Sequence, residues 1–253
     1  MSKVKILIVT HKDFTAPTSN MYLPVCVGVG RDALKNKYQP DNCGEHISEK
    51  NIRYCELTAL YWAWKNVDCD IIGLSHYRRL FSIKKGNKDI NALVTESDID
   101  RLLKKYDCVV VPKKRYFQSV KNHYINCIKS RKEANAIQLE LLRTVISEKY
   151  QDYLENYDRV MNRHSAHMLN MFIMPKPMMD EYCTWLFDIL FELEKKIEQN
   201  GVMYDRIMGA FSEFLLDVWL EKNNKKIIEI NMLETEKNFW KKLVWALKRK
   251  LVE

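Results

Sequence analysis

Two adjacent arginines stand directly after a short apolar run, and they are the sharpest chemical signal in the sequence. His76, Tyr77, Arg78 and Arg79 follow residues 70–74, which we predict to form a strand. Neighbouring guanidinium groups offer planar, permanently charged forks that suit a diphosphate. The alternatives are a solvated basic turn, or arginines that pair with carboxylates inside the fold.

Two other predicted strands also end in cationic residues. Residues 5–10 are followed by His11-Lys12-Asp13, and residues 108–111 are followed by Lys113-Lys114-Arg115. In open α/β sheets, ligands bind beyond the carboxyl ends of the strands. Three positive strand ends on one rim therefore predict a ligand that carries phosphate groups.

Carboxylates near a predicted helix over residues 206–220 are candidates for proton transfer. Asp205 precedes this helix and Glu213 lies on it. Carboxylates are common general bases for activating a hydroxyl, although acids on a helix are often solvated and Asp205 could be an N-cap. Glu56 lies in an apolar helix predicted for residues 51–65, so its charge needs a partner. An arginine of the 76–79 turn could supply one.

The candidate metal ligands have spacings that ordinary structural roles also explain. Asp68-Cys69-Asp70 precedes its strand, at the wrong end of the sheet, and Asp98-Ile99-Asp100 lies at a helix start, where the helix dipole favours acids. His164 and His167 have few acidic or cysteine partners nearby, which favours surface or capping roles over metal binding. We expect no bound metal and no cofactor, and cationic side chains would then neutralise a leaving diphosphate.

The composition indicates one globular domain. The chain has 253 residues, of which 47% are hydrophobic and 29% charged, and only 7 Gly and 6 Pro. This composition excludes collagen-like and low-complexity chains. Seven scattered cysteines without a Cys-x-x-Cys pair favour a reducing cytoplasm. We read the first apolar run as a strand rather than a signal peptide, and no run approaches the ~20 apolar residues of a membrane span.

Short strands alternate with helices along the chain. This order predicts an α/β fold, with a mixed, mostly parallel sheet covered by helices on both faces. Ser97 and Asp100 resemble a capping box that opens one helix. We predict a single domain over residues 1–235. The predicted strands cover residues 5–10, 70–74, 108–111, 168–174 and 226–230, and the predicted helices cover residues 51–65, 97–106, 133–161, 177–199 and 206–220.

Two segments concentrate positive charge. Residues 113–132 contain seven Lys or Arg and no acidic residue. Residues 236–253 form a predicted basic amphipathic helix with Trp240 and Trp245, which suits the inner leaflet of an anionic membrane; the alternative is a helix docked on the core. The net charge of +8 permits nucleic-acid binding, but no aromatic-laced basic stripe supports it, so we expect no nucleic-acid partner.

Several sequence blocks resemble a known family. They are LIVTHKDF (7–14), YCELTALYWAWKN (54–66), DIIGLSHYRRLF (70–81) and NMFIMPK (170–176). Over residues 3–222 the chain resembles bacterial capsule and O-antigen glycosyltransferases whose characterised members transfer galactofuranose from UDP-galactofuranose. The resemblance implies a GT-A-like fold and a cytoplasmic, peripherally membrane-associated enzyme with a lipid-linked acceptor.

The resemblance also implies site residues by position. The donor site would be lined by His76, Tyr77, Arg78 and Arg79, with Thr10, His11 and Lys12 near the nucleotide and Asn170 near the sugar or acceptor. Phe214 stands where the family's block containing Glu213 has an arginine. The general base therefore stays open between Asp205 and Glu213.

These observations lead to one expected function with two alternatives. We expect an inverting, metal-independent galactofuranosyltransferase that uses a UDP-sugar and an undecaprenyl-diphosphate-linked saccharide in capsule, exopolysaccharide or O-antigen synthesis. The basic segment 113–132 would contact the acceptor's diphosphate or act as a lid. One alternative is a transferase for another UDP-hexose. The other is a non-catalytic basic protein that binds nucleotides or nucleic acid.

Overall fold

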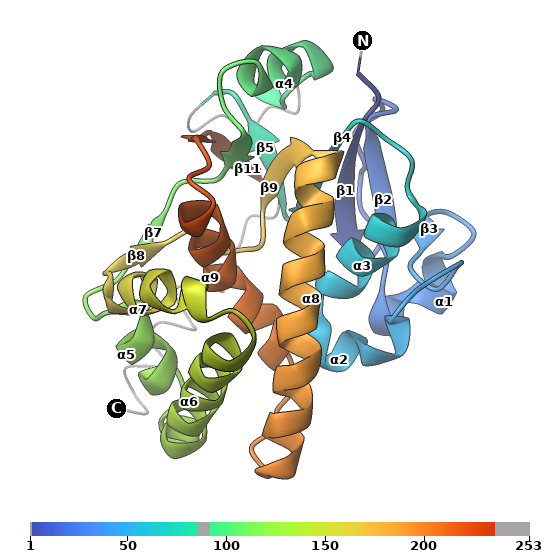
Figure 1. Ribbon diagram of the computed structural model, residues 1–253. Coiled ribbons are helices and arrows are strands. Elements are labelled where there is room, and N and C mark those ends of the chain that lie inside the picture. Colours follow the sequence, from blue (N-terminus) through green and yellow to red (C-terminus); the bar gives the residue numbers. More distant parts are fainter. Residues whose placement is uncertain (1, 85–91, 236–253) are drawn as a thin grey trace.

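A mixed sheet forms the centre of the molecule in the computed structural model, which describes residues 2–84 and 92–235 (Figure 1). The strand order is β10-β6-β9-β4-β1-β2-β3, with β5 and β11 attached beside β4, and β7 and β8 form a separate pair. The strands are β1 (Val4–Thr10), β2 (Tyr22–Cys26), β3 (Gln39–Pro40), β4 (Ile71–His76), β5 (Arg79–Ser82), β6 (Cys108–Val110), β7 (Lys114–Arg115), β8 (Ser165–Ala166), β9 (Phe172–Pro175), β10 (Ile227–Glu229) and β11 (Asn231–Glu234).

Helices cover this sheet, and the predicted fold class is confirmed. The long helix α8 crosses in front of the sheet, beside α9 and α3 (Figure 1). The helices are α1 (Arg31–Leu34), α2 (Asn51–Tyr54), α3 (Leu57–Asn66), α4 (Glu96–Leu103), α5 (Val120–Asn126), α6 (Lys132–Lys149), α7 (Leu154–Asn162), α8 (Lys176–Gln199) and α9 (Ile207–Lys222).

The first strand is buried on both faces because its apolar side chains alternate between two cores. Leu7 and Val9 belong to the large core under the helices, whereas Ile6 and Ile8 belong to a second core on the opposite face. Successive side chains of a strand point to opposite faces, so a continuous apolar run predicts burial on both. The second face is covered by α4 together with β5 and β11, so it is less helical than the sequence predicts.

The direction of each strand decides which strand ends lie at the same edge of the sheet. β4 pairs in parallel with β1, and β1 with β2, so their carboxyl ends share one edge of the sheet. β9 is the exception, because it runs antiparallel to β4 and to β6. The residues before β9 therefore reach the edge at which β1, β4 and β6 end.

Three local predictions are wrong in detail. The helix predicted over residues 51–65 is broken at Cys55, which has φ of 52°, and the Asn51 side chain caps the break by donating to the Cys55 carbonyl at 2.8 Å. The capping box of α4 uses Thr95 and Asp98 rather than Ser97 and Asp100. Residues 11–50, for which the sequence analysis predicts no strand or helix, contain β2 and β3. The C-terminal helix predicted for residues 236–253 lies outside the described residues.

Gly30 permits a close approach between the turn after β2 and the residue after β1. An ideal Cβ on Gly30 would lie 2.1 Å from the carbonyl oxygen of His11, so the backbone would have to move. We expect Gly30→Ala to lower the free energy of unfolding by about 3 kcal/mol. Gly201→Ala is the matched control, because Gly201 has φ of 66° with open space around it, and this change costs about 1 kcal/mol. Urea denaturation of both variants measures the difference, and equal losses would contradict the steric argument.

Candidate functional site

Two adjoining cavities lie at the carboxyl edge of the sheet. The larger has a volume of about 310 Å³ and the smaller about 70 Å³, and both are lined by Glu56, His76, Arg78 and Arg206. The larger cavity is also lined by Val9, Thr10, His11, Val27, Val29, Asn51, Ile52, Cys55 and Asp205. The smaller is also lined by Leu74, Ser75, Arg79, Leu169, Asn170 and Glu213. Eight of the ten residues singled out in the sequence therefore line this joined site.

The parallel register of β1 and β4 brings the first two cationic strand ends together. Val9 is the partner of His76, so His11 and the 76–79 turn follow at the same level. Burial, reinforced by the charges of Arg78 and Arg79, lowers the pKa of His76 to about 3. His76 is therefore neutral at pH 7. Its Nδ1 accepts the backbone N–H of Arg78 at 3.3 Å, which leaves the ring proton on Nε2.

Three arginines that line the site form no ion pair within the described residues. Arg78, Arg79 and Arg206 form no ion pair with any residue in the described ranges. The Nε of Arg78 is buried and has no hydrogen-bond partner, while its guanidinium carbon lies 5.4 Å from the centre of the Tyr77 ring. Buried donors are normally satisfied, so an unpaired one in a cavity wall marks a place for an acceptor. The alternative of internally paired arginines does not hold.

Arg206 reaches the site through an unusual backbone conformation. It is the N-cap of α9 and has φ of 66°, and its N–H donates to the Ile52 carbonyl at 2.8 Å. The sequence suggested Asp205 as a possible N-cap, so the cap lies one residue further along. A left-handed arginine has no local sequence signature, and this residue was missed for that reason. Asp205 itself is exposed and lines only the larger cavity.

Two carboxylates, Glu56 and Glu213, face the smaller cavity. Burial raises the pKa of Glu213 to about 7, and the nearby charge of Glu56 adds to the rise. A backbone hydrogen bond from Leu169 and the charges of Lys114 and Arg79 oppose it. A carboxylate with a pKa near neutrality is suited to accept a proton at physiological pH.

Asn170 orients one of these carboxylates. Its Nδ2 donates to Glu56 Oε1 at 2.8 Å and to the Gly209 carbonyl at 3.0 Å, and its Oδ1 accepts from the Ser212 hydroxyl at 2.9 Å. Asn170 is buried and has φ of 51°. The expected arginine partner of Glu56 is therefore replaced by an amide, and the three arginines stay available.

Other residues singled out in the sequence lie behind or beside the cavities. The Thr10 hydroxyl bonds the backbone of Lys12 and shapes the turn after β1. Tyr77 is buried against His11, with ring centroids 5.4 Å apart. Neither Lys12 nor Tyr77 is among the residues that line the two cavities.

The candidate metal ligands lie away from the cavities. Asp68 and Asp70 bond Lys3 at the opposite end of β4, and Asp98 caps α4. His167 is buried between Asp217 and Glu229 rather than at the surface. Within residues 2–84 and 92–235, no group of three or more His, Cys, Asp or Glu side chains is placed to hold a metal ion.

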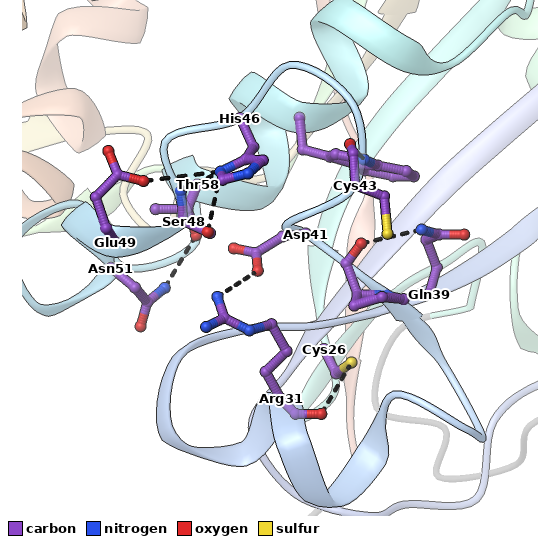
Figure 2. A network of polar contacts seen from close by, with 12 residues as sticks. Cys26, Arg31, Gln39, Asp41, Cys43, His46, Ser48, Glu49, Asn51 and Thr58 are labelled. Atoms are coloured by element: carbon purple, nitrogen blue, oxygen red, sulfur yellow. Dashed lines mark hydrogen bonds and ion pairs between the residues drawn. The ribbon is translucent and has the colours of Figure 1, made fainter.

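A polar network supports the wall of the larger cavity (Figure 2). Arg31 Nη1 contacts the fully buried Asp41 at 3.3 Å, and burial raises the pKa of that aspartate. Asn51 donates to the Thr58 hydroxyl at 3.0 Å. A Cβ on Gly28 would lie 2.2 Å from Asn51 Oδ1, so glycine is required for the turn to close on this side chain.

The raised pKa of Glu213 predicts a stability cost at high pH. Because the pKa is higher in the folded state, the favourable contribution of the protonated form is present below about pH 4.5 and is lost as the pH rises through about 7. We expect Glu213→Gln to raise the free energy of unfolding by up to about 3 kcal/mol at pH 8 and by much less at pH 5. Denaturation at both pH values measures this, and an equal change at both would contradict it.

The fold is shared with a protein of known structure. A structure of the WbbM bifunctional glycosyltransferase is similar to 93% of this chain, with a TM-score of 0.75 and 23% identity. The chain covers 46% of that protein, so it spans about half its length. No match is found among curated proteins. The family model described as "Domain of unknown function (DUF4422)" matches residues 5–225, and the chain therefore belongs to the DUF4422 family.

Proposed function

We propose that the protein is an inverting glycosyltransferase that moves galactofuranose from UDP-galactofuranose to a lipid-linked glycan acceptor in capsule, exopolysaccharide or O-antigen synthesis. The observation that carries the proposal is the set of three arginines that line one cavity at the carboxyl edge of the sheet and form no ion pair with a described residue. The similarity of the fold to that of WbbM supports a glycosyltransferase, and the resemblance of the sequence blocks supports the donor.

The larger cavity suits the nucleotide. Val29 and Ile52 are apolar and exposed to solvent, yet both line this cavity. Apolar side chains of this kind favour contact with the flat face of a base. Arg78 and Arg206 line both cavities, so they lie where the two join, and they would bind the diphosphate by charge-assisted hydrogen bonds.

The smaller cavity suits the reacting groups. The acceptor hydroxyl attacks the anomeric carbon of the sugar while the bond from that carbon to the β-phosphate oxygen breaks, which inverts the configuration. Glu213 takes the hydroxyl proton, and we favour it over Asp205 because it is half-buried and its pKa of about 7 suits a base. Arg78 and Arg79 stabilise the charge that develops on the departing UDP.

The acceptor and location complete the proposal. An undecaprenyl-diphosphate-linked saccharide would reach the enzyme at the inner leaflet, and the protein would be cytoplasmic and peripherally attached, with residues 236–253 as one contact. In residues 2–84 and 92–235, no helix is both long and apolar enough to cross a bilayer. The alternative, a transferase that uses another UDP-hexose as donor, is tested by assaying a panel of UDP-sugars.

Removing an arginine should reduce turnover strongly. We expect Arg78→Ala and Arg79→Ala each to lower kcat for transfer from UDP-galactofuranose by about 10²–10³-fold, because each removes a charge that stabilises the leaving group. Arg159→Ala is the matched control, since Arg159 forms an exposed pair with Glu155 away from the site. Activity should also persist in a chelator. A loss that a divalent ion restores, or unchanged rates in both variants, would contradict the role of the arginines.

The neighbouring carboxylate should shift the pH dependence. The rate should rise with pH through about 7 as Glu213 ionises. Glu56→Gln removes a negative charge beside Glu213, which favours its ionised form, so the acidic limb of kcat/KM should move to lower pH. Glu213→Gln should abolish this limb together with most of the activity. An acidic limb at the same pH in the Glu56 variant would contradict the assignment of Glu213.

A further inference from the structure

The segment that follows β6 combines an exposed aromatic ring with cations that form no ion pair with a described residue. Phe117 is fully exposed, and Ile128 is also among the exposed large hydrophobic side chains. The basic segment, residues 113–132, carries seven cations and no acidic residue. None of the seven forms an ion pair with a described residue, whereas many other surface cations do, such as Lys37 with Asp13 and Arg143 with Asp158.

The basic segment is compact and is tied to the body of the protein. β7 pairs with β8, so Lys114 and Arg115 are held beside Ala166 and Ser165. The Gln118 side chain accepts from Asn126 Nδ2 at 2.8 Å, which folds the residues after Phe117 back along α5. The apolar and basic groups are thus presented from an ordered scaffold on the side of the molecule formed by β7 and α5 (Figure 1).

The basic segment begins next to the smaller cavity. The ring of Tyr124 lies 6.2 Å from that of Phe214, the residue after Glu213. The charge of Lys114 opposes the rise in the pKa of Glu213, and burial raises the pKa of Tyr116, with a further contribution from the charge of Glu213. The exposed Phe117 follows directly. A surface that binds through Phe117 would therefore lie beside the end of the site that holds the proposed base.

We propose that the basic segment is a membrane-docking surface that inserts Phe117 into the headgroup region of an anionic bilayer. Cations near an anionic leaflet are attracted to it, and an exposed apolar ring gains free energy when it leaves water. Exposed Ile128 favours a bilayer over nucleic acid, because a bilayer accepts aliphatic and aromatic side chains alike, whereas surfaces that bind single strands rely on several aromatic rings. This inference rests on the proposed function in one respect: a docked basic segment would present the Glu213 end of the site to a lipid-linked acceptor.

Vesicle binding tests the surface without any substrate. The full chain is floated with phosphatidylcholine vesicles that contain about one third phosphatidylglycerol, and with vesicles of phosphatidylcholine alone. We expect binding to the anionic vesicles only, weakened by salt. Phe117→Ala should lower the partition coefficient about tenfold, and the triple variant K113E/R115E/K121E by at least as much. Lys114 is left unchanged because it lies near Glu213.

Matched variants control for apolar area and for net charge. Ile83→Ala removes an exposed apolar side chain elsewhere, and K35E/K104E/K105E reverses three exposed cations outside the basic segment. Both should bind as the unchanged protein does. Binding that survives in the Phe117 and triple variants would assign membrane contact to residues 236–253 and overturn the proposal. Equal losses in the controls, or tighter binding to RNA than to vesicles, would also overturn it.

The same variants separate this inference from the proposed function. Transfer to a water-soluble acceptor needs no membrane, so Phe117→Ala should keep its rate there and lose rate only with acceptor embedded in anionic vesicles. Loss of both rates would place Phe117 in the catalytic site and contradict docking. If the unchanged protein binds vesicles but transfers no sugar, the proposed function fails and the docking surface stands.

Discussion

The candidate site depends on arginine side chains that form no ion pair within the described residues. Burying a guanidinium nitrogen without an acceptor costs stability, and the Nε of Arg78 is in that state. The diphosphate of the proposed donor would recover this cost by accepting a hydrogen bond from that nitrogen. The neighbouring contacts keep the charge available: Asn170 satisfies Glu56, and His76 is neutral and bonds the backbone of Arg78.

Opposite charges lie side by side in the site. Glu56, Arg78 and Arg206 line both cavities, whereas Arg79 and Glu213 line only the smaller one. The proposed mechanism uses this arrangement, because arginines stabilise negative charge on a leaving group and a carboxylate accepts a proton. Leu169 and Asn170 both have positive φ immediately before β9, and backbone strain of this type collects at functional sites. The turn before the antiparallel strand β9 therefore brings these two residues with positive φ into the wall of the smaller cavity.

The basic segment, residues 113–132, places further positive charge on the surface beside the cavities. Its cations, like the three arginines, form no ion pair with a described residue, although the chain contains 33 acidic residues. Other surface cations do form such pairs, as Lys37 does with Asp13 and Arg143 with Asp158. Positive charge without an ion pair therefore occurs both in the cavity and on the surface beside it, and both places suit anionic partners.

The sequence by itself determined five strands (β1, β4, β6, β9 and β10), the long helices and the cationic strand ends, because apolar runs, periodicity and charge are local properties of a few neighbouring residues. The α/β class and the position of Arg78 and Arg79 in a cavity wall follow from these patterns. Only the tertiary structure decided the antiparallel direction of β9, the contact of Asn170 with Glu56 and the entry of Arg206. Each depends on segments over one hundred residues apart, or on a backbone conformation that other elements impose, and no local pattern records either.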